Sequence, residues 1–173
     1  RKAARKGIYI VLCSGRAENA ILGFVRMLDI AGLESGRYII ALNGASIYDM
    51  HERLTIYSRK VEGDVLLLAY REAQKYNLCA EVYNASTIFA PVDNEWTRVD
   101  ASLCKLKIEI VPEFAKLLER GHSKMIIPGD PDVLCSLQQR LKEILKDKAV
   151  IFTSKPYFLE VMPPNSGKGE ALL

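Results

Sequence analysis

The chain has 173 residues, a formal net charge of +3, 49% hydrophobic residues and 26% charged residues. This is the composition of a globular protein, and the length suits one ordinary domain or two small ones with a sizeable core. No basic stripe alternates with stacking aromatic residues, which argues against nucleic-acid binding, and no apolar run approaches the length of a membrane span.

The first third of the chain alternates between predicted strands and a predicted helix. Ile8–Cys13 is a continuous apolar run, which is typical of a parallel strand buried on both faces. Ala17–Asp29 carries apolar residues at helical spacing and is expected to end by Gly32, and Tyr38–Leu42 predicts a second buried strand. Two such strands joined by a helix predict a right-handed βαβ unit.

The rest of the chain predicts short strands and amphipathic helices without a flexible linker. Ser46–Asp49 and Leu54–Ser58 indicate a hairpin across a polar turn. Asp130 before Pro131 is a strong helix start, and a metal site at Asp130 and Asp132 is the alternative interpretation. Further strands are predicted at Leu78–Tyr83, Ser86–Ala90, Lys124–Ile127, Ala149–Thr153 and Tyr157–Val161, and further helices at 63–76, Trp96–Leu103 and Pro112–Arg120.

The cysteines and histidines show no metal-ligand or disulfide pattern. His51 and His122 stand far apart, and surface or turn positions are expected for both. Wide cysteine spacing without a CxxC pattern favours reduced, mostly buried thiols in a cytoplasmic protein. Arg1–Lys6 runs directly into a strand without a cleavage pattern, so no signal peptide is expected. The four cysteines are Cys13, Cys79, Cys104 and Cys135.

Polar residues follow the two predicted parallel strands, where ligands bind in open α/β sheets. Ser14 follows the first strand and Asn43 the second, and each precedes a glycine, Gly15 or Gly44. A hydroxyl with backbone N–H groups at the start of a helix suits a phosphoryl oxygen. Alternatively, Ser14 only caps the helix, and Asn43 with Gly44 only forms a tight turn. Arg16 either clamps an anionic substrate or is an ordinary exposed arginine.

A second candidate for phosphate binding lies near the other end of the chain, at Ser166–Gly169. This segment departs from the Walker pattern, because Met162 stands in place of the first glycine and Gly169 follows the lysine in place of Ser or Thr. A lysine between two glycines can still approach a phosphate closely. Lys168 is therefore either a phosphate ligand or a solvated loop residue.

Three short series of residues stand in order along the chain: Gly7–Arg16, then Asn43–Ala45, then Phe158–Val161 with Lys168–Leu172. These series, with separations that match along essentially the whole chain, resemble the Cof-type phosphatases of the haloacid dehalogenase-like hydrolase superfamily. The resemblance implies an α/β fold with a partial Rossmann-like core and a large inserted α/β cap. The implied domains are residues 1–46 for the core, 47–162 for the cap and 163–173 for the return to the core.

The resemblance also implies roles for individual residues. Ser14 would hydrogen-bond the transferring phosphoryl group, and Lys168 would balance the charge on the nucleophile and the phosphoryl oxygens. Asn43 would lie at the rim, where the core strand passes into the cap. Ser14 and Lys168 are thus the expected catalytic residues. The expected phosphate-binding set is Ser14, Gly15, Arg16, Asn43, Gly44 and Lys168.

The chain departs from the family at both ends of the motif series. Family members begin with an Asp-x-Asp motif that supplies the nucleophile, and they end with a Gly-Asp pair and a further Asp that hold Mg²⁺. This chain has neither motif at the corresponding place in the series, and Gly129–Asp130 precedes Lys168 and so cannot replace the last one. The resemblance therefore implies a Mg²⁺-dependent parent enzyme with an aspartyl-phosphate intermediate, no metal ligands in this chain, and no activity of the chain alone.

The expected substrate is a small phosphorylated metabolite such as a sugar phosphate, with no nucleic-acid or membrane partner. Two alternatives stay open: a non-catalytic, degenerate or cap-like protein that binds a ligand or a partner, and a phosphomutase of the same fold. A core that lacks several strands is expected to expose the apolar edges of Ile8–Leu12 and Tyr38–Leu42.

Overall fold

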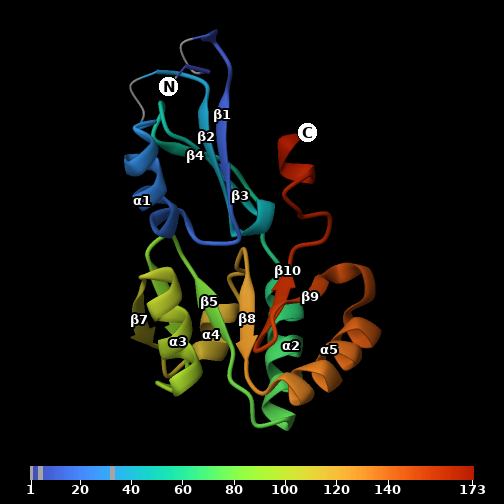
Figure 1. The fold of residues 1–173 in the computed structure, drawn as a ribbon. Coiled ribbons are helices and arrows are strands. Elements are labelled where there is room, and N and C mark those ends of the chain that lie inside the picture. Colours follow the sequence, from blue (N-terminus) through green and yellow to red (C-terminus); the bar gives the residue numbers. More distant parts are fainter. Residues whose placement is uncertain (1, 4–5, 32–33) are drawn as a thin grey trace. The chain divides into compact units, whose positions relative to one another are not determined.

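The structure is a computed structural model that describes residues 2–3, 6–31 and 34–173. The chain divides into two compact units. Unit 1 comprises Arg1–Arg59 with Ser166–Leu173, and unit 2 comprises Lys60–Asn165. Helices and strands alternate in both units (Figure 1), so the α/β fold class expected from the sequence is confirmed.

Unit 1 is built on a four-stranded mixed sheet with the order β1-β2-β3-β4. β1 (Ile10–Cys13) and β2 (Arg37–Ala41) pair in parallel and are joined through helix α1 (Glu18–Leu28), which confirms the predicted βαβ connection. β3 (Ser46–Asp49) and β4 (Leu54–Ser58) add two antiparallel strands. Parallel pairing places the carboxyl ends of β1 and β2 at the same edge of the sheet.

The hairpin of β3 and β4 continues the sheet of unit 1, whereas the sequence analysis assigned it to the cap from residue 47 onward. β3 pairs antiparallel with β2, from Tyr38 opposite Asp49 to Ala41 opposite Ser46. The boundaries between the units accordingly lie at 59/60 and 165/166, whereas 46/47 and 162/163 were expected. The hairpin stays in the sheet because the chain reverses in three residues, Leu42–Gly44, directly after β2.

Burial in unit 1 also differs from the expectation. β2 lies between two strands and is buried at Ile39, Ile40 and Ala41, so it has no exposed edge. β1 is an edge strand, as expected for Ile8–Leu12, but it is not buried on both faces, because its residues are half-buried or exposed and Tyr9 before it is 70% exposed. A purely apolar run therefore indicated a strand but not its burial. α1 ends at Leu28, and Gly32 lies outside the described residues.

Unit 2 contains a six-stranded sheet with the order β7-β6-β5-β8-β10-β9. Only β6 and β7 pair in parallel, and the other neighbours are antiparallel. The strands are β5 (Glu81–Tyr83), β6 (Thr87–Ala90), β7 (Lys107–Ile110), β8 (Met125–Pro128), β9 (Val150–Lys155) and β10 (Phe158–Met162), and the helices are α2 (Gly63–Lys75), α3 (Glu95–Cys104), α4 (Phe114–Leu118) and α5 (Pro131–Leu145).

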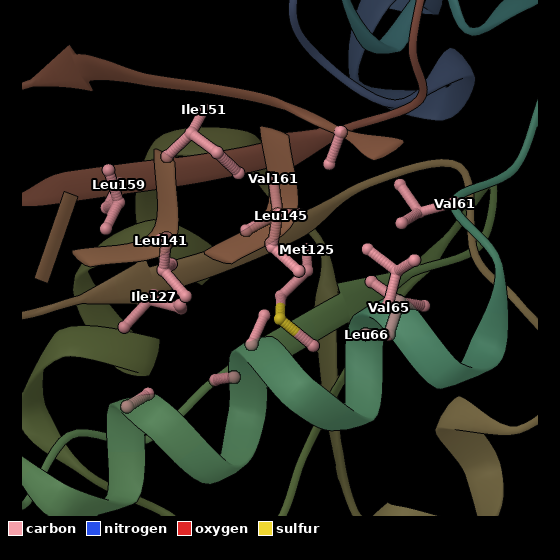
Figure 2. Close-up of a cluster of buried hydrophobic side chains, with 14 of the residues drawn as sticks. Val61, Val65, Leu66, Met125, Ile127, Leu141, Leu145, Ile151, Leu159 and Val161 are labelled. Atoms are coloured by element: carbon pink, nitrogen blue, oxygen red, sulfur yellow. The ribbon is translucent and has the colours of Figure 1, made fainter. Parts of the chain in front are cut away.

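The two faces of this sheet carry different side chains. One face packs against α2, α4 and α5 and forms the main hydrophobic cluster, in which the Met125 side chain points toward α2 (Figure 2). The other face carries a smaller apolar cluster, which includes Ala101 of α3 and Phe158, and several buried polar residues. Strand residues that alternate between the two faces explain this division. The labelled members of the main cluster are Val61, Val65, Leu66, Met125, Ile127, Leu141, Leu145, Ile151, Leu159 and Val161.

The predicted start of α5 is confirmed in atomic detail. The Asp130 carboxylate accepts hydrogen bonds from the backbone N–H groups of Asp132 and Val133, and Pro131 is the first residue of the helix. The capping interpretation of Asp130 therefore accounts for this segment. The described helix α4 is shorter than the predicted 112–120, and strand β7 was not predicted.

The cysteine prediction was partly wrong. Cys13 and Cys135 are exposed, and Cys79 and Cys104 are half-buried, so the thiols are not mostly buried. All four are free of disulfides. His51 is exposed in a turn, as expected, whereas His122 is half-buried and its Nε2 lies 3.0 Å from the Leu117 carbonyl oxygen. Among the described residues, no helix is long and apolar enough to cross a membrane.

Candidate functional site

The first part of the site is the turn that follows β1. The Ser14 N–H donates to the Ile40 carbonyl and so continues the parallel pairing by one residue. The Ser14 hydroxyl oxygen accepts a hydrogen bond of 3.1 Å from the Arg16 N–H. The N-cap of α1 is Ala17, which makes no side-chain capping bond. Ser14 therefore shapes its own turn and does not cap the helix, so the capping alternative for this residue is wrong.

The second part is the turn that follows β2, where three successive residues have a positive φ. These angles are 49° at Leu42, 55° at Asn43 and 98° at Gly44. Such angles are unfavourable for a leucine and cluster at functional sites. Two backbone hydrogen bonds join this turn to the turn that follows β1. The Leu42 N–H donates to the Arg16 carbonyl at 2.9 Å, and the Asn43 N–H donates to the Ser14 carbonyl at 3.1 Å.

Gly15 lies where these two turns meet. A Cβ atom on Gly15 would lie 2.6 Å from Oδ1 of Asn43, so no larger residue fits while the Asn43 side chain keeps its position. Asn43 therefore determines how closely the backbone of residues 14–16 approaches the second turn. The pair of Asn43 and Gly44, for which an ordinary tight turn was the alternative interpretation, thus also contacts the Ser14 turn.

The third part is the C-terminal segment of the chain, which returns to unit 1. A Cβ atom on Gly44 would fall on the backbone carbonyl of Gly167. The same carbonyl accepts a hydrogen bond of 3.1 Å from the Ala171 N–H in the final helical turn. Lys168, exposed to solvent, directly follows this contact. Residues from positions 14, 43 and 167 thus lie together although more than 120 residues separate the last two.

Electrostatics place the Lys168 charge near the end of β1. Burial raises the pKa of the Cys13 thiol above its ordinary value, and the positive charge of Lys168 acts in the opposite direction. Cys13 is the residue before Ser14, so Lys168 and Ser14 belong to one region of unit 1. The expectation that the serine turn and the glycine-flanked lysine lie together agrees with this geometry.

A cavity of about 400 Å³ adjoins the Ser14 turn inside unit 1. The Arg16 guanidinium lies 5.9 Å from the centre of the Phe24 ring and borders this cavity. The site thus combines the cationic side chains of Arg16 and Lys168 with the backbone of two tight turns. Such an arrangement suits a small anion. The cavity is lined by Leu12, Cys13, Ser14, Arg16, Ile21, Phe24 and Leu28.

One polar contact that supports the site carried no sequence signal. The Ser46 hydroxyl donates a hydrogen bond of 2.6 Å to Oε1 of Glu18, and Ser46 is only 5% exposed. Glu18 begins α1 just after the Ser14 turn, and Ser46 begins β3 just after Gly44. This bond therefore ties the downstream ends of the two turns together.

Among the described residues, no group of three or more His, Cys, Asp or Glu side chains lies close enough together to hold a metal ion.

Comparisons with known proteins identify the family. The family described as haloacid dehalogenase-like hydrolase matches residues 1–173. The chain is 28% identical over 202 residues to a Bacillus subtilis protein named 5-amino-6-(5-phospho-D-ribitylamino)uracil phosphatase YwtE, and the match covers 99% of this chain and 65% of that protein. The chain spans between 62% and 65% of the length of the curated relatives that it matches.

Solved structures agree with this result. A haloacid dehalogenase-like hydrolase from Bacteroides thetaiotaomicron has a TM-score of 0.86 at 26% identity and is matched over 99% of this chain and 64% of its own length. The structure of TM0651 from Thermotoga maritima has a TM-score of 0.84 at 26% identity, over 99% of this chain and 62% of its own. The resemblance inferred from the three motif series is thus confirmed, and the chain belongs to the haloacid dehalogenase-like hydrolases of the Cof type.

Proposed function

We propose that this chain supplies the phosphoryl-binding part of the active site of a phosphomonoester hydrolase. One observation carries the proposal: the turns after β1 and β2 and the glycine-flanked lysine lie together in unit 1, held by the bonds from Leu42 N and Asn43 N and by the close approach of Gly44 to Gly167. These are the three segments that carry the family's motif series. Family membership and the curated relative's name support phosphoryl chemistry at this place.

Each residue has a definite role in the proposal. The Ser14 hydroxyl and the N–H groups of its turn donate hydrogen bonds to phosphoryl oxygens. Gly15 lets the backbone come close to them, and the Lys168 ammonium offsets the negative charge that builds up in the transition state. Removing one preorganised donor of this kind lowers the rate of the reaction by about 10²–10³-fold. Arg16, exposed beside the cavity, attracts the anionic substrate.

The family motifs that supply the nucleophile and the Mg²⁺ ligands do not stand at their expected places in this sequence. We place them in a longer parent protein, since the chain spans less than two thirds of its relatives. The 173-residue chain is then expected to bind phosphate without turning over a phosphate ester. The aspartyl-phosphate intermediate belongs to the parent enzyme.

The proposed substrate is a small phosphorylated metabolite, such as a sugar phosphate. The Bacillus subtilis relative, named for a phosphorylated ribityl compound, supports this class. Unit 2, about 106 residues long by its limits at Lys60 and Asn165, is proposed as the cap that selects the substrate. Four cysteines without disulfides support a reducing compartment such as the cytoplasm.

The test is an assay of the complete gene product with Mg²⁺ and a generic aryl phosphate. Turnover is expected, and Ser14→Ala or Lys168→Ala should lower kcat/KM by about 10²–10³. Lys6→Ala is the matched control, because Lys6 is exposed in the same unit but precedes β1, at the opposite end of that strand. No turnover by the complete protein, or equal losses in Lys6→Ala and Lys168→Ala, would contradict the proposal.

A further inference from the structure

A buried polar cluster lies on the face of the unit 2 sheet that α3 covers. Glu81 and Tyr83 come from β5, and Asp100 comes from α3; their exposed fractions are 0%, 5% and 3%. The Tyr83 hydroxyl oxygen lies 2.7 Å from Oε1 of Glu81 and 2.5 Å from Oδ2 of Asp100. None of these residues belongs to the motif series or to the phosphate site.

The two short contacts of the Tyr83 hydroxyl determine how many protons this cluster holds. A tyrosine hydroxyl has one hydrogen and can donate it to only one carboxyl group. If both carboxyl groups were ionised, one of the two short contacts would join two oxygen atoms without a hydrogen between them. A protonated Glu81 removes the conflict, because its O–H donates to the tyrosine oxygen while the tyrosine O–H donates to Asp100. The geometry therefore requires one proton beyond that of the tyrosine.

A second observation points the same way. Oε2 of Glu81 is a buried oxygen with no hydrogen-bond partner among the described residues. An ionised carboxylate would leave half of its negative charge on this atom, which is costly in a buried position. A neutral carboxyl group leaves only a carbonyl oxygen there.

We propose that Glu81, Tyr83 and Asp100 form a proton-binding site inside unit 2, which holds one proton between its two carboxyl groups and couples the folding of this unit and the docking of α3 to pH. The site takes up a proton when unit 2 folds and releases it to solvent when the unit unfolds. No other reactant is needed.

The surrounding charges are consistent with one bound proton. The ammonium of Lys124, the residue before β8, lies 4.9 Å from the centre of the Tyr83 ring and 3.5 Å from Oε2 of Glu160 on β10, so its charge is already paired with a carboxylate. Burial, and secondarily the negative charge of Asp100, raises the pKa of Glu81 to about 8. β6 presents no ionisable side chain. Two thiols are further ionisable neighbours: that of Cys104, whose Sγ donates to Oδ1 of Asp100, and that of Cys79.

The sign of the pH effect follows from this raised pKa. Between the ordinary carboxyl pKa of 4.5 and about 8, the folded state holds one proton more than the unfolded state. The stabilisation is therefore complete below 4.5 and is lost as the pH rises through about 8. Each pH unit in this window raises the unfolding equilibrium constant by up to about tenfold. His122, whose pKa burial lowers, acts in the opposite direction below 6.5, so variants must be compared at each pH.

The test is urea unfolding of the 173-residue chain, wild type and Glu81→Gln, at several pH values from about 5 to about 8. Trp96 is the only tryptophan in the chain, lies on α3 and stacks on Tyr157 at 5.9 Å, so its fluorescence reports the docking of α3. We expect the unfolding constant of the wild type, relative to Glu81→Gln, to rise by on the order of 10²–10³ across this range. A ratio that stays constant within about twofold would overturn the proposal.

Glu72→Gln is the matched control, because Glu72 is a buried glutamate of the same unit whose pKa is lowered, first by its hydrogen bond with Lys75. The unfolding constant of the wild type relative to Glu72→Gln should not vary between about pH 5 and about pH 8. If Glu81→Gln does not fold, Asp100→Asn takes its place, and the ¹³Cδ resonance of Glu81 is titrated in the wild type. A midpoint near 8 supports the site, and a midpoint near 4.5 overturns it.

Discussion

The close approach of Gly44 to Gly167 predicts that Gly44→Ala separates the C-terminal segment from the two turns. The new methyl group would fall on the Gly167 carbonyl, which is backbone and cannot move alone. The φ of 98° at Gly44 is also unfavourable for alanine. Both effects act on the contact that brings Lys168 to the site.

The expected cost can be worked out from these two effects. A positive φ costs an alanine about 1–2 kcal/mol. Displacing packed neighbours adds about 1–3 kcal/mol. Alanine also makes the unfolded chain less flexible than glycine does, which stabilises the folded state by about 0.4–1 kcal/mol. We therefore expect Gly44→Ala to lower the free energy of unfolding by about 1–4.5 kcal/mol, unless the segment detaches and so avoids the second cost.

Two measurements distinguish these outcomes. Urea denaturation followed by circular dichroism gives the change in stability, and hydrogen exchange at the Ala171 N–H reports whether its bond to Gly167 persists. Gly23→Ala is the control, because Gly23 lies within α1 and an added Cβ would meet no atom within 4 Å. It should stabilise the chain by about 0.5–1 kcal/mol. Unchanged stability together with unchanged Ala171 exchange in Gly44→Ala would refute the reasoning.

Three further predictions concern stability. Leu141→Ala removes a fully buried side chain from the main cluster of unit 2 and should cost about 2–5 kcal/mol in calorimetry; a cost below about 1 kcal/mol would contradict the packing. Glu72→Gln should be less stable than wild type above pH 4.5, and this deficit should vanish as the pH falls through the lowered pKa of Glu72, which acid denaturation measures. Ser46→Ala leaves Glu18 without this hydrogen-bond donor and should cost about 1–2 kcal/mol, with weaker phosphate binding in an NMR titration; an unchanged affinity would show that the Glu18 bond does not support the site.

Much of the fold could be predicted because its signals are local. The apolar runs before Ser14 and Asn43 mark β1 and β2, and the Asp130–Pro131 pair marks the start of α5. Periodicity does not report what covers a strand, so burial on both faces was wrongly expected for β1, which is mostly half-buried. Strand β7 was missed because Lys107–Ile110 is short, lies at the edge of its sheet and is mostly exposed.

The candidate site, too, could be predicted from the sequence only in part. Ser14 and Asn43 could be placed at one sheet edge from the topology, and Lys168 through the family resemblance; their chemical roles stay predictions. The bond between Glu18 and Ser46 joins residues 28 positions apart and has no motif. The pair of Glu81 and Asp100 is likewise created by tertiary packing, since α3 brings the aspartate to β5. Contacts of this kind depend on three-dimensional placement, which residue spacing alone does not encode.

The central claim is that the Ser14 turn, the Gly44 turn and the segment at Lys168 bind one anion together. The most direct measurement is an NMR titration of the ¹⁵N-labelled chain with inorganic phosphate. We expect the backbone N–H signals of Ser14, Gly15, Gly44 and Lys168 to shift along one saturable curve with a common Kd. Shifts confined to Lys168, or separate curves for the three segments, would contradict the claim.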